Sequence, residues 1–447
     1  MIQNKLSRRL SAGVALMLCA GMMTIGSSVV ASAAPKTPGV TAKLITIGAT
    51  EPVTGIASPG YSDVSRGANA VFKYVSAKGG VNGRKIKYII KDDCYGTPGF
   101  NCTGVPNTAS QTHALLSAHI FATVGSLGTP TQDSVRTLLK QNHVPQLFVA
   151  SGSRDWNNPH QYPGLFGWQT SYNEEGKIFA QYINATYPKD NVCYLGQGDD
   201  FGADGLAGLL AGGVSPADTA LYNVGALVVS QGASVAPTVA RFQSDKCTVV
   251  VLDTIPGATD AVFGAALKLG YAPHWIISSV GSDPVTVDAP FASLPFPDPE
   301  IGAVSFSYLP ASTSTNVWVG WMRKVLLADK TDFPNFTSTS PITGNMAYGI
   351  SYAVSFLEAV KATGKNLTRA TLLKTMTTHT FAQTPALTAL RYTANNHQGL
   401  SGGYLVTVTS ATSTTALDGQ VYVTDSSTTG AVKKVSAVKA SIPAWLK

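Results

Sequence analysis

Short apolar runs typical of strands alternate with helical patterns along most of this chain, and no other feature of the sequence constrains its fold as much. Leu44–Ala49 is the first such run, and residues 64–75 then carry apolar side chains at helical spacing. This first helix is predicted to begin at a cap formed by Ser62 and Asp63 and to end at Gly79-Gly80. The later strand-like runs are Ile86–Lys91, Ile120–Val124, Gln146–Val149, Val192–Leu195, Ala226–Val229, Thr248–Asp253 and Trp275–Ser278.

Strands that alternate with helices such as Glu174–Tyr187 imply parallel sheets covered by helices on both faces. A Pro-rich segment at residues 290–299 interrupts the alternation, and the tail from Tyr392, rich in Thr, Ser and Val, predicts short antiparallel strands. Between them lie three helical stretches, Val317–Ala328, Gly344–Thr363 and Leu367–Met376. Because this number of parallel strands exceeds one α/β unit of ordinary size, we predict an α/β fold with two lobes. The length of 447 residues, at roughly 150 per domain, agrees with that prediction.

The first residues are typical of a secretory signal peptide, predicted to span residues 1–33. Basic residues precede an apolar stretch at 10–25, and the small residues 31–33 offer a cleavage site. A transmembrane anchor is the alternative, but the stretch is shorter than the roughly 20 residues that a spanning helix needs. We therefore expect an exported protein, periplasmic or at the cell surface, whose mature chain has no membrane-spanning segment.

Four cysteines follow the predicted signal peptide. Cys94 and Cys102 lie in a Gly/Pro-rich loop and are expected to form a disulfide that staples it. Cys193 and Cys247 each lie near the start of a strand-like run, so they could pair across neighbouring strands. Metal ligation is the alternative for these residues. The chain contains no C-x-x-C or H-x-x-x-H spacing, so disulfides are favoured and no metal site is expected.

The formal net charge of +7 raises the question of nucleic-acid binding. Nucleic-acid-binding proteins concentrate Lys and Arg on one face or stripe, but the densest basic cluster here is only Arg84, Lys85 and Lys87. Three further positive charges, Lys5, Arg8 and Arg9, belong to the predicted signal peptide. Charged residues make up 13% of the chain, compared with about 25% in typical globular proteins. No nucleic-acid partner is expected.

No motif predicts a catalyst or a cofactor. Gly196–Gly202 resembles a dinucleotide fingerprint, but its last glycine comes one residue late, which favours a plain strand-to-helix turn. Ser351 lies in a pattern similar to a nucleophile elbow, which requires a strand before it, whereas its surroundings are helical. The acidic pairs Asp92-Asp93 and Asp199-Asp200 are more typical of helix caps or hydroxyl-binding groups than of a glycosidase. We expect a protein that is not an enzyme.

Several predicted strands open at their carboxyl ends into loops of Gly, Ser, Thr and aromatic residues. Ligands of open α/β sheets bind outside these strand ends. Hydroxyls, backbone N–H groups and a helix N-terminus such as the one near Thr131 suit a carboxylate or a similar small anion. The alternative is that Ser, Thr and Gly are simply common in such loops. The loops are Thr50–Tyr61, Gly125–Thr129, Ala150–Ser153, Gly196–Gly202 and Val280–Asp283.

Three segments make the sequence resemble the type I solute-binding proteins of branched-chain amino acid ABC transporters. The first is Lys78–Ile86, which is followed by Asp92-Asp93 and lies after a helix preceded by Pro52–Gly55. The others are Asp199–Gly202 and Ala266–Tyr271. The resemblance implies two Rossmann-like lobes with parallel sheets, joined by a three-segment hinge and closing on a ligand. Residues 43–167 plus 312–390 would form the first lobe, and 168–311 plus 391–447 the second.

The resemblance also implies the roles of individual residues and the partners. From the first lobe, Tyr61 would cover the ligand, Leu127, Gly128 and Thr129 would bind a carboxylate, and Ala150, Ser151 and Gly152 would add carbonyl and hydroxyl contacts. From the second lobe, Phe201 takes the place of the family's pocket tyrosine, Tyr172 and Ile255 would line the wall, and Gly281 lies in the last ligand loop. A monomer that delivers a small molecule to an ABC permease is expected, without any cofactor.

Some residues depart from the family pattern, and the departures concern the ligand. Members that bind α-amino acids place a carboxylate in the second lobe against the ligand ammonium, but Ser279–Gly281 contains no acid. Ile255-Pro256 replaces an aromatic residue, and Phe201 lacks the tyrosine hydroxyl. We therefore expect a carboxylate or amide other than a standard branched-chain amino acid. A sensory ligand-binding module and a secreted hydrolase using Ser351 or an Asp pair are the alternative functions.

Overall fold

The structure is a computed structural model that describes residues 37–97, 100–293, 298–427 and 429–447. The predicted signal peptide, residues 1–33, lies outside these described residues. Among the residues that are described, no helix combines the length and the apolar character that crossing a membrane requires.

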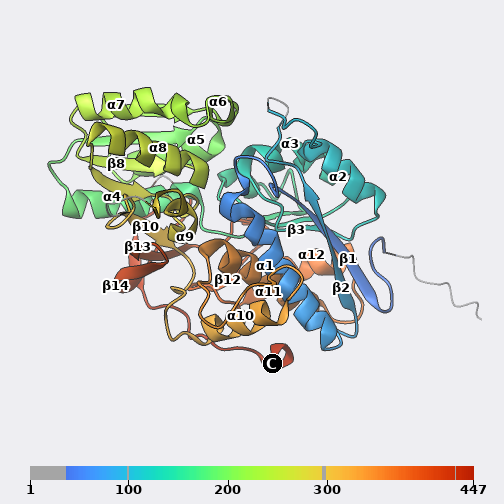
Figure 1. Ribbon diagram of the computed structural model, residues 1–447. Helices are drawn as coiled ribbons and strands as arrows, with labels where there is room; N and C mark the ends of the chain where they lie inside the picture. Colours follow the sequence, from blue (N-terminus) through green and yellow to red (C-terminus); the bar gives the residue numbers. More distant parts are fainter. Residues whose placement is uncertain (1–36, 98–99, 294–297, 428) are drawn as a thin grey trace, which may run out of the picture. The chain divides into compact units, whose positions relative to one another are not determined.

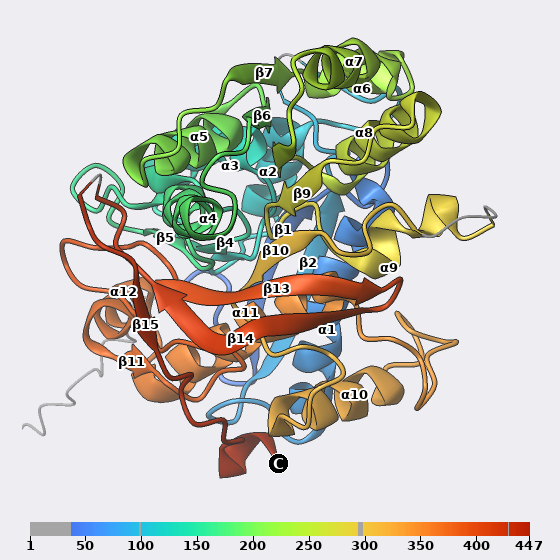
Figure 2. The same ribbon diagram turned by 90° about the vertical axis from the view of Figure 1, so that its left-hand side faces the viewer.

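The strands form two main sheets, and together they confirm the predicted α/β fold. The strands are β1 (Leu44–Glu51), β2 (Lys85–Asp92), β3 (Thr123–Val124), β4 (Gln146–Val149), β5 (Leu165–Gly167), β6 (Val192–Gln197), β7 (Asp218–Tyr222), β8 (Val249–Asp253), β9 (His274–Ile277), β10 (Val304–Ser307), β11 (Thr380–Phe381), β12 (Leu390–Arg391), β13 (Gly402–Ser410), β14 (Ser413–Val423) and β15 (Lys433–Val435). The first sheet has the order β2-β1-β3-β4-β5 and is parallel throughout. The second has the order β15-β14-β13-β10-β9-β8-β6-β7; it is parallel from β10 to β7, whereas β13, β14 and β15 are antiparallel (Figure 2).

Helices cover both sheets (Figure 1). They are α1 (Ser58–Ala77), α2 (Thr108–Ser117), α3 (Thr129–Gln141), α4 (Tyr172–Thr186), α5 (Asp200–Ala211), α6 (Val224–Val229), α7 (Ala236–Ser244), α8 (Pro256–Leu269), α9 (Pro284–Val287), α10 (Val317–Ala328), α11 (Gly344–Thr363) and α12 (Arg369–Thr378). We call the first sheet with its helices α1–α3 and α10–α12 the first lobe, because α10 and α11 pack against α1. The second sheet with α4–α9 is the second lobe.

Three segments of the chain connect the lobes between β5 and β13, and after β15 the last residues return to the first lobe, where the Trp321 indole N–H donates to the Leu446 carbonyl at 3.3 Å. The chain leaves the first sheet after β5 through residues 168–171, returns after β10, and leaves again between β12 and β13. Hydrogen bonds tie the first and third crossings together, since the Leu400 N–H donates to the Trp168 carbonyl at 2.8 Å. This connectivity is the three-segment hinge that the resemblance implied, and it brings residues distant in sequence to the junction of the lobes.

Helices α1 and α11 cross at unusually short range. A Cβ placed on Gly349 would lie 1.8 Å from the Val64 carbonyl oxygen, and one on Gly67 would lie 2.6 Å from the Met346 carbonyl oxygen. Each helix therefore presents a glycine where the other presents its backbone. This contact attaches the segment between β10 and β13, which contains α10–α12, to the first lobe.

Both predicted disulfides are present. Cys94 is bonded to Cys102 within the loop that follows β2, and Cys193 is bonded to Cys247. Cys193 lies in β6, and Cys247 lies just before β8, which pairs with β6 in parallel. The expectation that this pair links neighbouring strands is therefore confirmed.

One predicted strand is wrong. Residues 226–229 belong to helix α6, and the strand of this region is the earlier segment β7. The Asn223 side chain accepts a hydrogen bond from the Ala226 N–H and so starts the helix. A short apolar run cannot distinguish a strand from a helix by its period, and Val229, 86% exposed, is not part of a buried strand at all.

The start of the first helix also differs from the prediction. Helix α1 begins at Ser58 without a side-chain cap, and its backbone is non-helical at Pro59 and Gly60. The regular helical turns therefore start close to the predicted Ser62-Asp63 cap. The turn that begins at Ser58 extends α1 beyond this cap towards the N-terminus. The loop between β1 and α1 is bound to the end of β2, because the Thr54 hydroxyl donates to the Asp92 carboxylate at 2.6 Å. The helices predicted at 317–328 and 344–363 have the predicted bounds.

Candidate functional site

A cavity of about 150 Å³ lies at the carboxyl ends of strands from both sheets. First-lobe residues that follow β1, β3 and β4 line one side, and second-lobe residues that follow β6 and β9 line the other. A single ordered water needs ~10–15 Å³ of such space, so the cavity can hold a small organic molecule. This is the place where open α/β sheets bind ligands.

Hydroxyl groups gather at one end of the cavity, at the N-terminus of α3. The hydroxyl oxygens of Thr129 and Ser151 are 2.7 Å apart, and the Tyr172 hydroxyl lies 3.4 Å from that of Ser151. Gly128 precedes the helix with φ 108°, and a Cβ there would come within 2.4 Å of Thr131 Oγ1. The first turn of α3 contains no acidic residue. A helix N-terminus carries partial positive charge, so this end can accept an anionic or carbonyl group.

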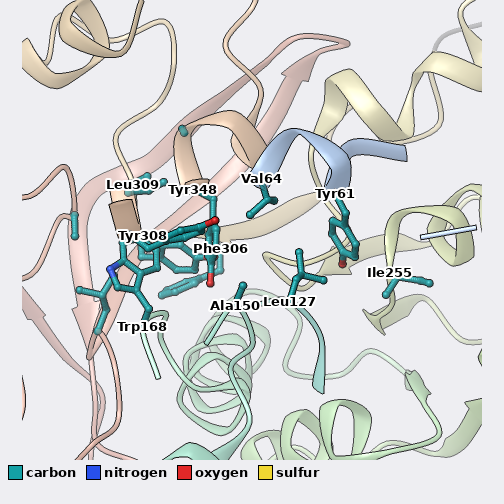
Figure 3. Close-up of a cluster of buried hydrophobic side chains, with 14 of the residues drawn as sticks. Tyr61, Val64, Leu127, Ala150, Trp168, Ile255, Phe306, Tyr308, Leu309 and Tyr348 are labelled. Carbon is teal, nitrogen blue, oxygen red and sulfur yellow. The ribbon is translucent and has the colours of Figure 1, made fainter. Parts of the chain in front are cut away.

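Aromatic rings form much of the remaining wall (Figure 3). The Tyr172 and Phe201 ring centroids are 4.3 Å apart. Beside the hinge, Tyr308 and Tyr348 line the cavity, and Trp168 packs edge-on against both, with centroids 5.6 and 4.9 Å away. Aromatic and aliphatic walls with a few polar groups are typical of sites for small molecules with an apolar body.

The structure brings most of the residues implied by the resemblance to this cavity. Those that line it are Tyr61, Leu127, Gly128, Thr129, Ala150, Tyr172 and Phe201. Ser151 and Gly152 lie directly behind the lining: the Ser151 hydroxyl contacts those of Thr129 and Tyr172, and Gly152 packs against the Tyr172 ring. These two residues support lining side chains rather than facing the cavity.

Ile255 and Gly281 do not line the cavity. Ile255 is buried at the start of α8, where its N–H donates to the Tyr222 hydroxyl at 3.1 Å. Gly281 packs against the backbone of Thr254, since a Cβ on it would lie 2.2 Å from that carbonyl oxygen. Val280, beside Gly281, lines the cavity instead, and its carbonyl oxygen lies 3.5 Å from the Tyr61 hydroxyl.

Sequence reasoning missed lining residues in the hinge and beside it. Gln169 lies in the first crossing, Tyr308 follows β10, and Tyr348 lies on α11. The Tyr348 hydroxyl donates to the Gln169 side-chain oxygen at 2.8 Å. Two signals in the sequence could have located Gln169 and Tyr308. These residues follow the short apolar runs of β5 and β10, which the sequence analysis does not include among its strands.

The cavity has almost no free charge. Among the described residues that line it there is no Lys, Arg or His, and the one acid is Asp283. Its carboxylate accepts hydrogen bonds from the Gly344 N–H at 3.0 Å, the Thr286 hydroxyl at 2.8 Å and the Asn345 amide at 3.3 Å. Burial raises the pKa of this carboxyl. These three donors take up most of the acceptor positions of the Asp283 carboxylate and hold it against α9 and the start of α11.

A second acid lies just behind the lining, where sequence reasoning placed none. Glu175 on α4 is 1% exposed, and it accepts hydrogen bonds from the Ser279 N–H at 2.6 Å and the Ser279 hydroxyl at 2.9 Å. Burial raises its pKa to about 8, with the charge of Asp253 adding to the effect. Both carboxylate oxygens are occupied, and Ser279 separates them from the cavity.

The two lobes contact each other around the cavity. Arg154, in a 3₁₀ turn of the first lobe, donates from Nε and from its backbone N–H to Asp204 on α5, at 2.7 and 2.8 Å. The Gln197 amide donates to the Tyr95 hydroxyl at 3.2 Å. The Asp283 contacts with Gly344 and Asn345, described above, also cross between the lobes. The structure is therefore a closed form.

The Arg154–Asp204 contact is expected to hold this closed form. Asp204→Ala removes two hydrogen bonds to a charged group, each worth about 1.5–3 kcal/mol, and shifts the ligand-free protein towards an open form. We expect a larger radius of gyration by small-angle X-ray scattering. Asp218→Ala is the matched control, because Asp218 pairs with Arg241 inside the second lobe. Equal radii for the two variants would mean that the contact does not govern closure.

The sequence motifs that resembled catalytic or cofactor-binding sites have structural roles in the fold. Ser351 is fully buried on α11, and its hydroxyl donates to the Ala347 carbonyl at 2.6 Å, as expected for a residue on a packed helix. The glycine-rich segment after β6 is a strand-to-helix turn in which the Asp199 side chain accepts from the Phe201 N–H at 2.9 Å. Asp93 is fully buried and accepts from the Thr108 hydroxyl.

Comparisons with known proteins agree with this geometry. A family model described as periplasmic binding protein matches residues 44–413. No match was found among curated proteins.

Among solved structures, a possible leucine/isoleucine/valine-binding protein from Rhodopirellula baltica is 19% identical, with a TM-score of 0.69 over 84% of this chain and 96% of that one. A fatty acid ABC transporter substrate-binding protein from Thermomonospora curvata is 15% identical, with a TM-score of 0.68 over 92% and 95% of the chains. A benzoate-bound solute-binding protein of an ABC transporter from R. palustris is 15% identical, with a TM-score of 0.68 over 88% and 98%. At these identities the structural likeness concerns the fold.

Proposed function

The chain belongs to the periplasmic binding protein family, and on that premise we propose that it captures a small molecule between its lobes and delivers it to the permease of an ABC transporter. The cavity at the strand ends of both lobes supports this proposal, because a ligand there would contact both lobes and stabilise the closed form. The structurally similar proteins are binding proteins rather than enzymes.

We propose further that the ligand is a carboxylate or amide with an apolar or aromatic body. The hydroxyls of Thr129 and Tyr172 and the N-terminus of α3 would bind its polar group. The rings of Phe201, Tyr308 and Tyr348 would enclose its body. Structures of similar fold include proteins described as binding benzoate and as serving a fatty acid transporter, and such ligands share this chemistry.

The observation that supports the ligand class is that the described residues around the cavity offer no acid without hydrogen-bond donors of its own. An α-amino acid would bring an ammonium group, and both Asp283 and Glu175 are already occupied by hydrogen-bond donors. Burying a charged group without a partner costs several kcal/mol. That cost corresponds to at least about a hundredfold in affinity.

Calorimetric titration with leucine and with benzoate tests this proposal. We expect no leucine binding below millimolar concentration. Benzoate, or another aromatic acid or amide from a thermal-shift screen, should raise the melting temperature with concentration. Micromolar leucine binding would contradict the proposed ligand class.

A pair of variants then tests the position of the ligand. Thr129→Val removes the hydroxyl that faces the cavity and should weaken the best binder by about tenfold, since one hydrogen bond contributes about 1 kcal/mol or slightly more. Thr137→Val is the matched control on the same helix, because its hydroxyl contacts that of Tyr162 instead. Equal affinities for the two variants would place the ligand elsewhere.

A further inference from the structure

Among the residues that the structure describes, three buried carboxyl groups outside the ligand cavity have no hydrogen-bond partner. Glu51 and Glu300 are 0% exposed and Asp288 is 1% exposed. Neither oxygen of any of the three receives a hydrogen bond. Buried polar groups in native proteins are almost always hydrogen-bonded, so three such acids in one chain require an explanation.

Glu51 ends β1 inside the first lobe. The ionisable groups that face it are Asp93, which follows β2, Tyr88 on β2, and Tyr348 and Tyr352 on α11. None of these groups is a cation. The Tyr88 hydroxyl donates to the Val124 carbonyl at 3.0 Å and lies 3.3 Å from that of Tyr352, so it does not serve Glu51.

Asp288 and Glu300 belong to a second group in the other lobe. Asp288 follows α9 and Glu300 precedes β10, and the charges that act most on Glu300 are those of Asp288, Asp283, Asp260 and Asp298. Asp260 on α8 also has a buried oxygen without a partner. All of these neighbours are acidic. Within the described part of the chain, no group of such side chains is spaced to hold a metal ion.

An ionised carboxylate in such surroundings is far costlier than a neutral acid. A buried charge without a partner shifts its protonation rather than remaining ionised. Burial, followed by the repulsion of the neighbouring acids, raises the pKa of Asp288 to about 7 and that of Asp260 to about 8. The pKa values of Glu51 and Glu300 also lie well above the ordinary value, for the same two reasons.

We infer that the native chain holds Glu51, Asp288 and Glu300 as neutral carboxylic acids and is built to fold and work in an acidic medium. In the unfolded chain these groups ionise near pH 4. The contribution of Asp288 to stability is therefore fully present below about pH 4 and is lost as the pH rises through about 7. The contributions of Glu51 and Glu300 are likewise present at acidic pH and are lost as the pH rises through their own raised pKa values. The composition agrees, because only 13% of the residues are charged, which limits the number of ion pairs that acid could break.

Carboxylates with lowered pKa values oppose this effect at the acid end. Arg241 lowers the pKa of Asp218, Lys73 that of Asp329, and Lys434 that of Asp418, each by hydrogen bonding and charge. Their contributions are present above about pH 4 and are lost as the pH falls further. The expected stability maximum is thus mildly acidic.

Urea unfolding of the full-length protein at pH 4.5 and pH 8.0 tests the inference. We expect the ratio of folded to unfolded protein to fall at least about tenfold from pH 4.5 to pH 8.0. The variant E51Q/D288N/E300Q carries neutral amides of the same shape, so it should match the wild type at pH 4.5 and exceed it at pH 8.0. If the triple variant does not fold, Glu300→Gln alone should show the same pattern with a smaller gain.

The control variant is Asp245→Asn, which changes an exposed acid at the end of α7 and should follow the wild type at both pH values. Stability that is equal or greater at pH 8.0 would overturn the inference, as would amide variants that keep the full pH dependence. Stabilisation of the wild type at pH 8.0 by 1 mM Ca²⁺, absent in the amide variants, would also overturn it, because a cation would then neutralise the acids.

Discussion

Replacing Gly349 by alanine is expected to lower the free energy of unfolding by about 3 kcal/mol, the upper end of the usual range for overpacking. The added Cβ would lie 1.8 Å from the Val64 carbonyl oxygen, a distance that no side-chain rotation can relieve. Either α1 and α11 must separate or the backbone of α1 must shift. Since α11 joins the second and third crossings to the first lobe, the hinge geometry would change with it.

Urea unfolding followed by circular dichroism measures this loss, and two other glycines provide controls. Gly320 on α10 and Gly264 on α8 also lie inside helices, but a Cβ on either would have no neighbour within 4 Å. Alanine there should stabilise the protein by about 0.5–1 kcal/mol, because glycine is a poor helix former. If Gly349→Ala instead behaved like these controls, the close crossing of α1 and α11 would be wrong.

Replacing both Cys193 and Cys247 by alanine is expected to lower the free energy of unfolding by about 4 kcal/mol. The bond closes a loop with a sequence separation of 54, compared with 8 for the Cys94–Cys102 bond. A longer loop leaves the unfolded chain more freedom once the bond is removed, so the shorter one should contribute less, about 2.5 kcal/mol.

The comparison of the two cysteine pairs is the informative measurement. Both double-alanine variants avoid free thiols, so urea midpoints at one pH compare them directly. Cys193 and Cys247 are also buried against core strands, and their replacement by smaller side chains adds to the loss. A larger loss for the short-loop variant would show that the entropy of the unfolded chain does not govern these contributions.

Glu175, one of the two acids near the ligand cavity, shows that an acid absent from a sequence motif can come from a distant part of the chain. The segment after β9 has no acid of its own, and Glu175, 104 residues away in sequence, approaches it from α4. The carboxylate binds the Ser279 backbone and hydroxyl and so holds the ligand loop in place. A residue that could have received a ligand ammonium therefore has a structural role here.

Local patterns were sufficient for most elements. Helices α10 and α11 have the predicted bounds because their apolar periodicity extends over several turns and Asn316 and Thr343 cap them. The prediction of a strand at residues 226–229 was wrong because four apolar residues fit either a strand or a helix. The predicted start of α1 is too late because a turn that begins at Ser58 joins the helix across a kink at Pro59 and Gly60, where the backbone is non-helical.

What the sequence determined by itself is the alternation of strands and helices, and with it the parallel sheets, the loops at their carboxyl ends and the Cys94–Cys102 disulfide, whereas the Cys193–Cys247 pair was one of two alternatives until the structure joined it. The features that the sequence determined follow from the local period of apolar residues and from the spacing of residues near each other in the chain. Only the tertiary structure decided which of those loops face one cavity, and it added Gln169 and Tyr308 from the hinge and Tyr348 from α11. It also left Glu51, Asp288 and Glu300 buried without partners. The physical reason is that burial and the choice of partner depend on contacts between residues far apart in the sequence, which no local pattern records.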